Sequence, residues 1–318
     1  MQFALESFNS LCHSNVKEIL KFIMKYCIIY NKNASSGRKS KFIKKISDEL
    51  SKYNDVSFFE TESVDKAEAV FKNISKLNID RLVVAGGDGS VSFAINKLIK
   101  NNFVPKKDFA IGYIPAGTAN LLQAELNMSK KISKIVQILQ SNNLKQTNLV
   151  KINNDYFILM AGIGWDATIV HSINSSLKKL LGKIIFGYKG LQKFLLMKNQ
   201  KLKVNIDGQN HIADWVLCSN TNYYAGHYKI NKTNIFDNKI ITYVFKDLTR
   251  IKILYYIYLI IFFGDLSKST SVITSYSSEL KIDGQGKKIP IQIDGDKYQY
   301  CDNVELRKSG KYFNILTA

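Results

Sequence analysis

The feature that most constrains the fold is a repeated pattern in the first half of the chain. Short apolar runs each end in a turn of small or polar residues, and an amphipathic helical pattern follows. The runs lie at 26–30 (YCIIY), 81–85 (RLVVA) and 109–114 (FAIGYI), and helical spacing is clear at 41–52 and 91–100. Such runs are typical of buried strands. Strands that alternate with helices across short connections predict a parallel sheet covered by helices.

The character of the chain changes near residue 145. Beyond it, short strand patterns alternate with turn signals such as Asn153-Asn154 and Asp283-Gly284, which are typical of hairpins. We therefore predict a two-domain protein. An N-terminal three-layer α/β/α domain with a parallel sheet covers residues 24–145, and a β-sandwich-like C-terminal domain covers residues 146–318. Helical insertions are expected near 172–198 and 249–263.

Both ends of the chain lie outside this simple division. Residues 1–23 precede the first strand pattern and are expected to be an extension that stands apart from the rest of the fold, with a start codon placed too far upstream as the alternative. The sequence leaves open whether the tail at 305–318 packs back on the first domain.

The charge balance and the cysteines limit the classes of partner and compartment. Lys and Arg total 45 against 26 Asp and Glu, a net charge of +19. An anionic partner, such as a nucleotide, an acidic membrane surface or a nucleic acid, explains this excess, and so does a general enrichment of the composition in lysine. The four cysteines lack the spacing of metal or redox pairs, which predicts a reducing intracellular compartment.

Two apolar segments bear on membrane contact. The longest uncharged apolar run, at 253–264, has 12 residues, whereas a bilayer span needs about 20, so we expect no membrane crossing. Because this run is apolar on every side, we expect it to be buried in the core, with contact to lipid as the alternative. Between Asp166 and Asp207 there is no acidic residue, and lysines interleave with leucines. That pattern is typical of a membrane-surface contact, and equally of a helix packed on the second domain with a solvated lysine face.

The glycine-rich turn after the third strand is the first candidate binding site. Its sequence is Gly86-Gly87-Asp88-Gly89-Ser90. Glycine allows tight bends and close approach of a ligand, and parallel sheets bind anions where a strand ends and the next helix begins. We interpret this as a phosphate-facing turn in which Asp88 acts through a divalent cation shared with the phosphate. The alternative is a plain tight turn with Asp88 as a helix N-cap.

Two further turns have the same position at the end of a strand. One is IPAGTAN at 114–120, and the other is the polar loop at 31–37. Small residues with a hydroxyl and an amide suit a phosphate or a ribose. The sequence contains neither G-x-x-x-x-G-K-[ST] nor G-x-G-x-x-G, so a P-loop and a dinucleotide-binding Rossmann site are both unsupported.

Taken in order, these segments resemble the diacylglycerol kinase catalytic family, the lipid kinases that include the sphingoid-base kinases. The matching segments are Asn31 with Ser36 and Gly37, Thr61 ahead of Ala67, GGDGS at 86–90, PAGTAN at 115–120, AGIGWDA at 161–167 and IDGD at 293–296. Together they span most of the chain. Three positions depart from the family pattern: Asp296 replaces Glu, Asn238 replaces Gly, and Leu121 stands where many diacylglycerol kinases have Asp.

The resemblance implies an enzyme that uses ATP and Mg²⁺ to phosphorylate the hydroxyl of diacylglycerol or of a related lipid such as a sphingoid base. It implies a cytoplasmic protein held peripherally at the anionic inner face of the membrane, and it leaves a homodimer open. The implied catalytic residues are Asp294, Asp296 and Asp88, with one of the first two as general base. The implied ATP contacts are Asn31, Ser36, Gly37, Thr61, Gly86, Gly87, Asp88, Gly89, Ser90, Gly117, Thr118 and Asn120. Asp88 and Asp237 are the implied metal ligands, Asp237 at a structural Mg²⁺.

Two alternatives belong to other functional classes. NAD kinases carry GGDG and phosphofructokinases carry GGDGS, so a soluble small-molecule kinase shares the central turn. A non-catalytic basic module that binds membranes or nucleic acid would also explain the charge. The late Asp294-Gly295-Asp296 and the turn at 161–167 favour the lipid kinase, and the retained Asp88, Ser90 and Thr118 argue against a decayed site. We expect no nucleic-acid partner.

Overall fold

The computed structural model describes residues 23–32, 39–173, 189–192, 194–196, 200–226, 228–237 and 240–318. The expected N-terminal extension therefore lies outside the described residues, except for residue 23. Ser36, Gly37 and most of the lysine-rich segment between Asp166 and Asp207 also lie outside them.

The first part of the chain is built on four parallel strands in the order β2-β1-β3-β4. These are β1 (Lys25–Asn31), β2 (Asp55–Thr61), β3 (Arg81–Gly86) and β4 (Ala110–Pro115). Every residue of β3 and β4 is buried. Burial on both faces is the reason why these strands appear in the sequence as continuous apolar runs instead of alternating ones.

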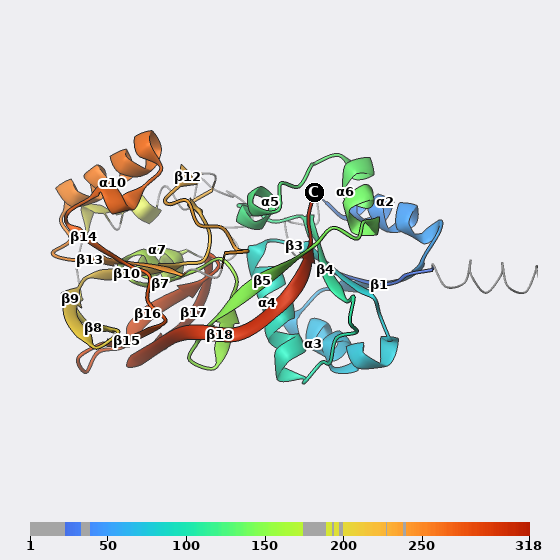
Figure 1. Ribbon diagram of the computed structural model, residues 1–318, viewed down its shortest axis with the longest axis horizontal. Coiled ribbons are helices and arrows are strands. Elements are labelled where there is room, and N and C mark those ends of the chain that lie inside the picture. Colours follow the sequence, from blue (N-terminus) through green and yellow to red (C-terminus); the bar gives the residue numbers. More distant parts are fainter. Residues whose placement is uncertain are drawn as a thin grey trace, which may run out of the picture.

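Helices cover both faces of this parallel sheet, as predicted. Figure 1 shows helices on both faces of the sheet, which gives the α/β/α layering. The first face carries α2 (Ser40–Ser51) and α6 (Ile132–Gln140), and the second carries α3 (Val64–Asn73), which runs into the 3₁₀ turn η2 (Ile74–Leu77), and α4 (Asp88–Lys100). The short helix α5 (Leu121–Glu125) follows β4.

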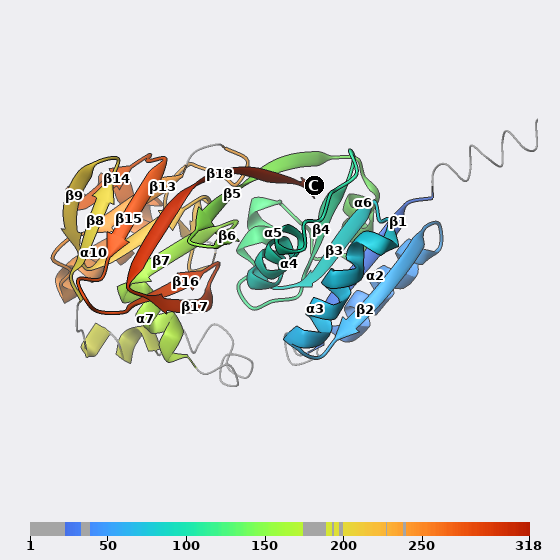
Figure 2. The same ribbon diagram turned by 90° about the horizontal axis from the view of Figure 1, so that it is seen from below.

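The same sheet continues beyond β4 into the second half of the chain. The long strand β18 (Asn303–Leu316) lies next to β4 in parallel, with Ile315 paired to Ile111, and next to β5 (Leu144–Ile152) in antiparallel register. Figure 2 shows β5 and β18 running together from the β-rich part to the α/β part. The sheet is completed by β15 (Glu279–Asp283), β8 (Leu202–Ile206) and β9 (Gln209–Ala213), while β6 (Asp155–Phe157) pairs with β5.

A second, antiparallel sheet packs on this extension and forms the β-sandwich-like part. Its order is β14 (Val272–Ser275), β13 (Ile241–Phe245), β10 (Trp215–Ser219), β7 (Met160–Gly164), β16 (Ile289–Ile293) and β17 (Asp296–Cys301). Ile163 and Val216 from this sheet share a core with Val204 and Leu280 from the first sheet. The helix α7 (Trp165–Ser172) follows β7, and the small hairpin of β11 (Tyr223–Tyr224) and β12 (Tyr228–Lys229) precedes β13. The predicted two-domain fold class is confirmed.

The prediction that the apolar run at 253–264 is buried is wrong. This run forms most of α10 (Arg250–Phe263), which is followed by the 3₁₀ turn η3 (Leu266–Lys268). Only Ile253, Tyr256 and Leu259 of α10 are buried, and the opposite side is exposed. The helix is apolar all round, yet the fold covers one side of it. No helix among the described residues is long and apolar enough to cross a membrane.

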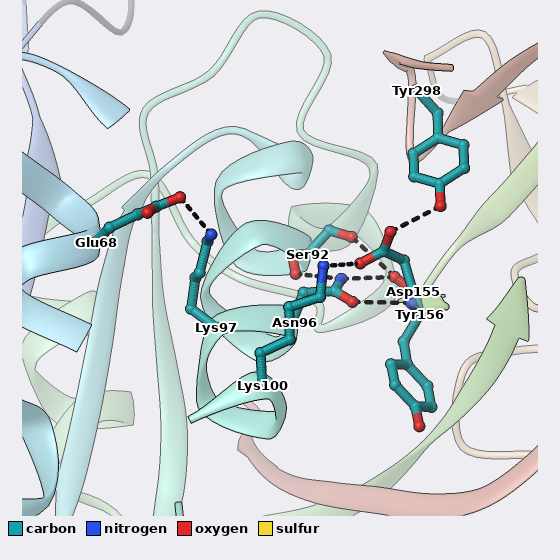
Figure 3. A network of polar contacts seen from close by, with 8 residues as sticks. All are labelled: Glu68, Ser92, Asn96, Lys97, Lys100, Asp155, Tyr156 and Tyr298. Atoms are coloured by element: carbon teal, nitrogen blue, oxygen red, sulfur yellow. Dashed lines mark hydrogen bonds and ion pairs between the residues drawn. The ribbon is translucent and has the colours of Figure 1, made fainter. Parts of the chain in front are cut away.

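A polar network joins α4 to the β-rich part (Figure 3). The Asn96 amide nitrogen donates to the Tyr156 carbonyl at 2.8 Å, and its oxygen accepts from the Tyr156 amide at 2.8 Å. One helix turn later, Lys100 pairs with Asp155 at 2.5 Å, and Asp155 also accepts from the Tyr298 hydroxyl at 2.7 Å. This network fixes α4, which starts at the glycine-rich turn, against strand β6.

We expect Asn96→Ala to weaken this junction by about 1–3 kcal/mol, because it removes the side-chain acceptor of the Tyr156 N–H and leaves the Tyr156 carbonyl with only the longer bond from the Ser92 hydroxyl, at 3.4 Å. Asn73→Ala is the matched control, since the Asn73 amide bonds only to the exposed Ala69 carbonyl of its own helix. The free energy of unfolding in urea measures both. Equal effects of the two variants would contradict the role given to Asn96.

Candidate functional site

The two glycine-rich turns lie against each other, backbone to backbone. A Cβ on Gly117 would overlap the Cα of Gly87, and it would lie 2.7 Å from the side-chain oxygen of Asn120. The amide of Ala116 donates to the carbonyl of Gly86 at 2.8 Å. The glycines at 87 and 117 therefore allow the two strand ends to approach each other closely. Close approach of backbone is a common reason for a cluster of glycines.

Asp88 connects the two turns through its side chain. It lies in the first turn of α4 and is 6% exposed. Its two carboxylate oxygens accept from the amides of Leu121 at 2.9 Å and Leu122 at 3.0 Å, which are the first residues of α5. The sequence left open that Asp88 caps the helix that follows its own turn. In the structure Asp88 instead caps α5, which follows the other turn. Asp88 accepts from two of the N–H groups at the start of α5 that have no partner within that helix.

The other polar residues of these turns either bond within the turn or are exposed to solvent. Asn120 adopts the left-handed conformation with φ 53°, which asparagine tolerates well. Its side chain donates to the Gly117 carbonyl at 3.0 Å and accepts from the Tyr113 hydroxyl at 3.1 Å. Thr118 is exposed, and Ser90 packs against Gly86. Thr118 therefore presents its hydroxyl to solvent, whereas Asn120 shapes the turn.

The ends of the two outer strands lie side by side. Asn31 at the end of β1 is in register with Thr61 at the end of β2. The Thr61 hydroxyl donates to the Tyr30 carbonyl at 3.2 Å, and Thr61 is only 2% exposed. Among the residues expected to contact ATP here, Asn31 is half-buried at a strand end, and Thr61 is used to hold the two strand ends together.

The carboxylate of Asp294 is enclosed by backbone amides. It accepts from the amides of Ile158 at 3.1 Å, Leu159 at 2.8 Å and Met160 at 2.9 Å, the segment that leads into β7. Burial raises the pKa of Asp294 to about 6, while these N–H groups act in the opposite direction. Asp294 has φ 50°, so the chain turns sharply here.

The turn at Asp294 directs Asp296 to the glycine-rich turn. Asp296 begins β17 and is exposed, and its carboxylate lies so close to Gly89 that a Cβ there would overlap it. The structure therefore brings the late D-G-D segment onto the first turn of α4. Of the two candidate bases, Asp296 lies at this turn, and Asp294 lies behind it among backbone amides.

The donor set at the turn suits a hard cation such as Mg²⁺. Asp88 precedes Gly89 in the first turn of α4, and the Asp296 carboxylate lies against Gly89. Mg²⁺ is commonly held by one or two carboxylates together with phosphate oxygens. Within the described part of the chain, no three His, Cys, Asp or Glu side chains form a group of the kind that holds a metal by protein ligands alone. Asp237 lies apart from this turn, and its carboxylate accepts from the amide and side chain of Asn234, both at 3.2 Å.

Two charged residues near the turns were not singled out from the sequence. The Lys39 ammonium donates to the carbonyl of Pro115 at the end of β4, and burial together with the nearby Lys130 charge lowers its pKa. Glu125 of α5 accepts from the Thr221 hydroxyl and from the Asn222 amide at 3.0 Å. Burial raises the pKa of Glu125. Lys39 lies two residues after the loop at 31–37, but nothing in the sequence distinguishes it from the chain's many other lysines.

The turn at 161–167 forms a buried acidic position in the β-rich part. Gly162 leaves room for the Asp166 carboxylate, which accepts from the Gln292 amide at 3.3 Å. Burial raises the pKa of Asp166 to about 7. Asp166 in α7 and Asp294 in the turn after β16 are thus two buried acids, and Gln292 of β16 contacts the first and lies two residues before the second.

Comparison with known proteins agrees with the resemblance seen in the sequence. Residues 25–152 match the sequence model of the diacylglycerol kinase catalytic domain. Diacylglycerol kinases of Staphylococcus carnosus (strain TM300) and Staphylococcus aureus (strain MRSA252) are 24% and 26% identical, over 85% of this chain and 87% and 85% of the relatives. A solved structure of a diacylglycerol kinase from Bacillus anthracis str. Sterne matches with a TM-score of 0.73 and 22% identity, covering 93% of this chain and 97% of the other. That structural likeness establishes the fold.

Gly117→Ala should destabilise the protein by about 1–3 kcal/mol, because backbone atoms cannot rotate away from an added methyl group. Gly190→Ala is the control, since a Cβ there meets nothing within 4 Å, and alanine is the better helix former. The midpoints of urea unfolding compare the two. If Gly117→Ala were as harmless as Gly190→Ala, the close approach of the two turns would be wrong.

Asp166 should make stability decrease as the pH rises. The folded protein keeps this proton up to about pH 7, whereas the unfolded chain loses it near the ordinary value of about 3.9. Unfolding between these values therefore releases a proton, and the free energy of unfolding falls as the pH rises through this window. Asp166→Asn removes this contribution, so the loss of stability from pH 4.5 to about pH 7 should be smaller in the variant than in the wild type. Parallel pH dependences in urea titrations would contradict the raised pKa.

Proposed function

Because residues 25–152 match the sequence model of the diacylglycerol kinase catalytic domain, we propose that this protein transfers the γ-phosphate of ATP to the hydroxyl of diacylglycerol, or of a related lipid such as a sphingoid base. We place the reaction at the anionic inner face of the membrane, with the protein cytoplasmic and peripherally bound. The observation that carries the proposal is the approach of Asp296 to Gly89, since it puts a carboxylate beside a turn suited to phosphate.

The nucleotide is proposed to place its phosphates at Gly86–Ser90, where α4 begins. Helix α4 has 13 residues, and its first N–H groups and positive dipole end favour an anion at this position. Thr118, which is exposed on the facing turn, and Asn31 at the end of β1 are proposed as direct contacts. Thr61 and Asn120 support the site by holding strand ends and turn, as their hydrogen bonds suggest.

Asp296 is the proposed general base. An alcohol is a weak nucleophile, so a carboxylate within reach of the acceptor hydroxyl helps by accepting its proton as the bond to phosphorus forms. Asp294 acts as a positioning residue, because its buried carboxylate holds the segment before β7 and the turn that presents Asp296. Most of the rate enhancement is expected from positioning and charge neutralisation, as in other phosphoryl transfers.

Mg²⁺ is the proposed metal at the turn, where Asp88 would hold it together with the phosphates. When bound, it supplies positive charge that offsets the charge of the transferred phosphoryl group. A second, structural Mg²⁺ is proposed at Asp237. The Asp237 charge contributes to the raised pKa of Glu125, so these two carboxylates lie close enough to interact. Carboxylate oxygens are suitable ligands for such a cation.

The test is transfer of labelled γ-phosphate from ATP and Mg²⁺ to diacylglycerol, monoacylglycerol, sphingosine or ceramide in anionic mixed micelles. Loss of the proposed base in Asp296→Asn should lower the rate by about 10²–10⁴-fold. Asp302→Asn is the matched control, because Asp302 is also exposed and directly follows β17, at the other end of the strand that Asp296 begins. Its rate should equal that of the wild type.

Three outcomes would count against this assignment. Label in NAD or fructose 6-phosphate instead of a lipid would indicate a soluble kinase with the same turn. Equal rates for Asp296→Asn and the wild type would remove Asp296 as the base. Binding to anionic micelles without ATP binding or label transfer would favour a non-catalytic membrane module.

A further inference from the structure

The outer side of α10 is a continuous apolar surface. Its exposed side chains recur every three or four residues, so they lie along one side of the helix. The largest exposed fractions are those of Ile251 at 80%, Phe262 at 70% and Leu254 at 57%. In Figure 1, α10 lies on the outside of the β-rich part, away from α2 and α3.

This surface is large for a protein that stays in water. Its exposed aromatic residues are Tyr255, Tyr258, Phe262 and Phe263, with 42%, 47%, 70% and 48% exposure. At ~150–250 Å² for a whole aromatic side chain, they alone expose on the order of 400 Å². That already equals the largest apolar patch of a typical soluble monomer, about 300–600 Å². The exposed aliphatic residues, such as Ile251 and Ile261, add to it.

A second group of exposed leucines is fastened to the start of α10. The Arg250 guanidinium donates to the carbonyl of Phe194 at 3.2 Å and to that of Leu195 at 2.6 Å. Leu191, Leu195 and Leu196 are 56%, 57% and 66% exposed. A second group of exposed apolar side chains therefore lies next to the start of α10, and Arg250 connects the two.

The charges around this surface are positive. Helix α10 contains no acidic residue; Arg250 and Lys252 lie at its start, and Lys268 after its end has its ammonium 4.3 Å from the centre of the Phe263 ring. The two acidic residues that flank the helix are engaged elsewhere. Asp247 pairs with Lys201 at 2.9 Å, and Asp265 accepts from the amide and hydroxyl of Ser267. Apolar side chains bordered by cations match the interface of an anionic bilayer.

We propose that the exposed side of α10, together with Leu191, Leu195 and Leu196, is the surface by which this protein lies on an anionic membrane. The 14 residues of α10 give it a length of about 21 Å, less than the ~30 Å hydrocarbon core, so the helix lies in the interface plane. A second copy of the chain fits less well, because a symmetric contact would place the flanking cations of both copies together. The reason for membrane binding rests on the proposed function, since a lipid substrate lies in the membrane. The binding itself is measured without catalysis.

The test is co-flotation of the full chain with phosphatidylcholine vesicles that contain or lack phosphatidylglycerol. The variant Leu254→Ser/Tyr258→Ser/Phe262→Ser removes three side chains from the exposed side and should lower the partition coefficient by on the order of 100-fold. The matched control, Tyr53→Ser/Val104→Ser, removes apolar side chains that are 76% and 85% exposed in the α/β part. It should bind as the wild type does, and wild-type binding should be weaker without phosphatidylglycerol.

Equal flotation of the triple variant and the wild type would overturn the proposal. So would a wild type that is dimeric by light scattering and becomes monomeric in the triple variant while its flotation is unchanged, because α10 would then be a contact between copies. Kinase assays separate this question from the reaction. The triple variant should phosphorylate a short-chain, water-soluble diacylglycerol at the wild-type rate and lose activity only on vesicles. If the wild type phosphorylates neither, the proposed function fails, and the flotation result still decides the role of α10.

Discussion

The carboxylate of Asp88 is the interaction on which the candidate site depends. By accepting from the first two amides of α5, it ties the turn after β3 to the turn after β4. A buried carboxylate is costly unless it is hydrogen-bonded, and free amides at a helix start are costly unless they are paired. Here the hydrogen bonds between the Asp88 carboxylate and the two amides of α5 offset both of these costs. The close contact of Gly87 with Gly117 is the steric condition for this arrangement, because any larger residue at position 117 would move the turns apart.

Asp294 repeats this arrangement in the β-rich part. Its carboxylate collects the amides of residues 158–160, so the start of β7 and the end of β16 are held at a fixed distance. The side of α4 that carries Asn96 then docks on β6, a few residues upstream of those amides. The buried carboxylates of Asp88 and Asp294 and the side-chain amide of Asn96 thus determine how Asp296 contacts Gly89. The chemistry proposed for this site depends on contacts that are largely made by backbone groups.

The sequence predicted the parallel sheet, its helical cover and the β-rich second part because each rests on a local pattern. Buried parallel strands are apolar runs, and turns at strand ends are rich in glycine. It did not predict that Asp88 caps α5 or that Asp294 is enclosed by amides, because both contacts join segments 33 residues or more apart. The error at α10 has a different cause. Apolar residues on every side of a helix normally indicate burial, and the sequence does not say whether protein or another apolar medium covers the second side. Lys39 shows a further limit, because one lysine among many has no distinguishing pattern.

Strand β18 joins the two halves of the molecule, and its place near the end of the chain also affects the order in which they can fold. It pairs with β4 and β5, which belong to the first half of the chain, yet it is the last of the described strands to be synthesised. Until it emerges from the ribosome, the outer edge of β4 has no neighbour, and an unpaired strand edge is a site where chains associate wrongly. The α/β half therefore completes its sheet only after the β-rich half has been made. Folding of this chain during translation is expected to proceed with the first domain held partly open, and chaperones that shield exposed strand edges are the factors that this order of events calls for.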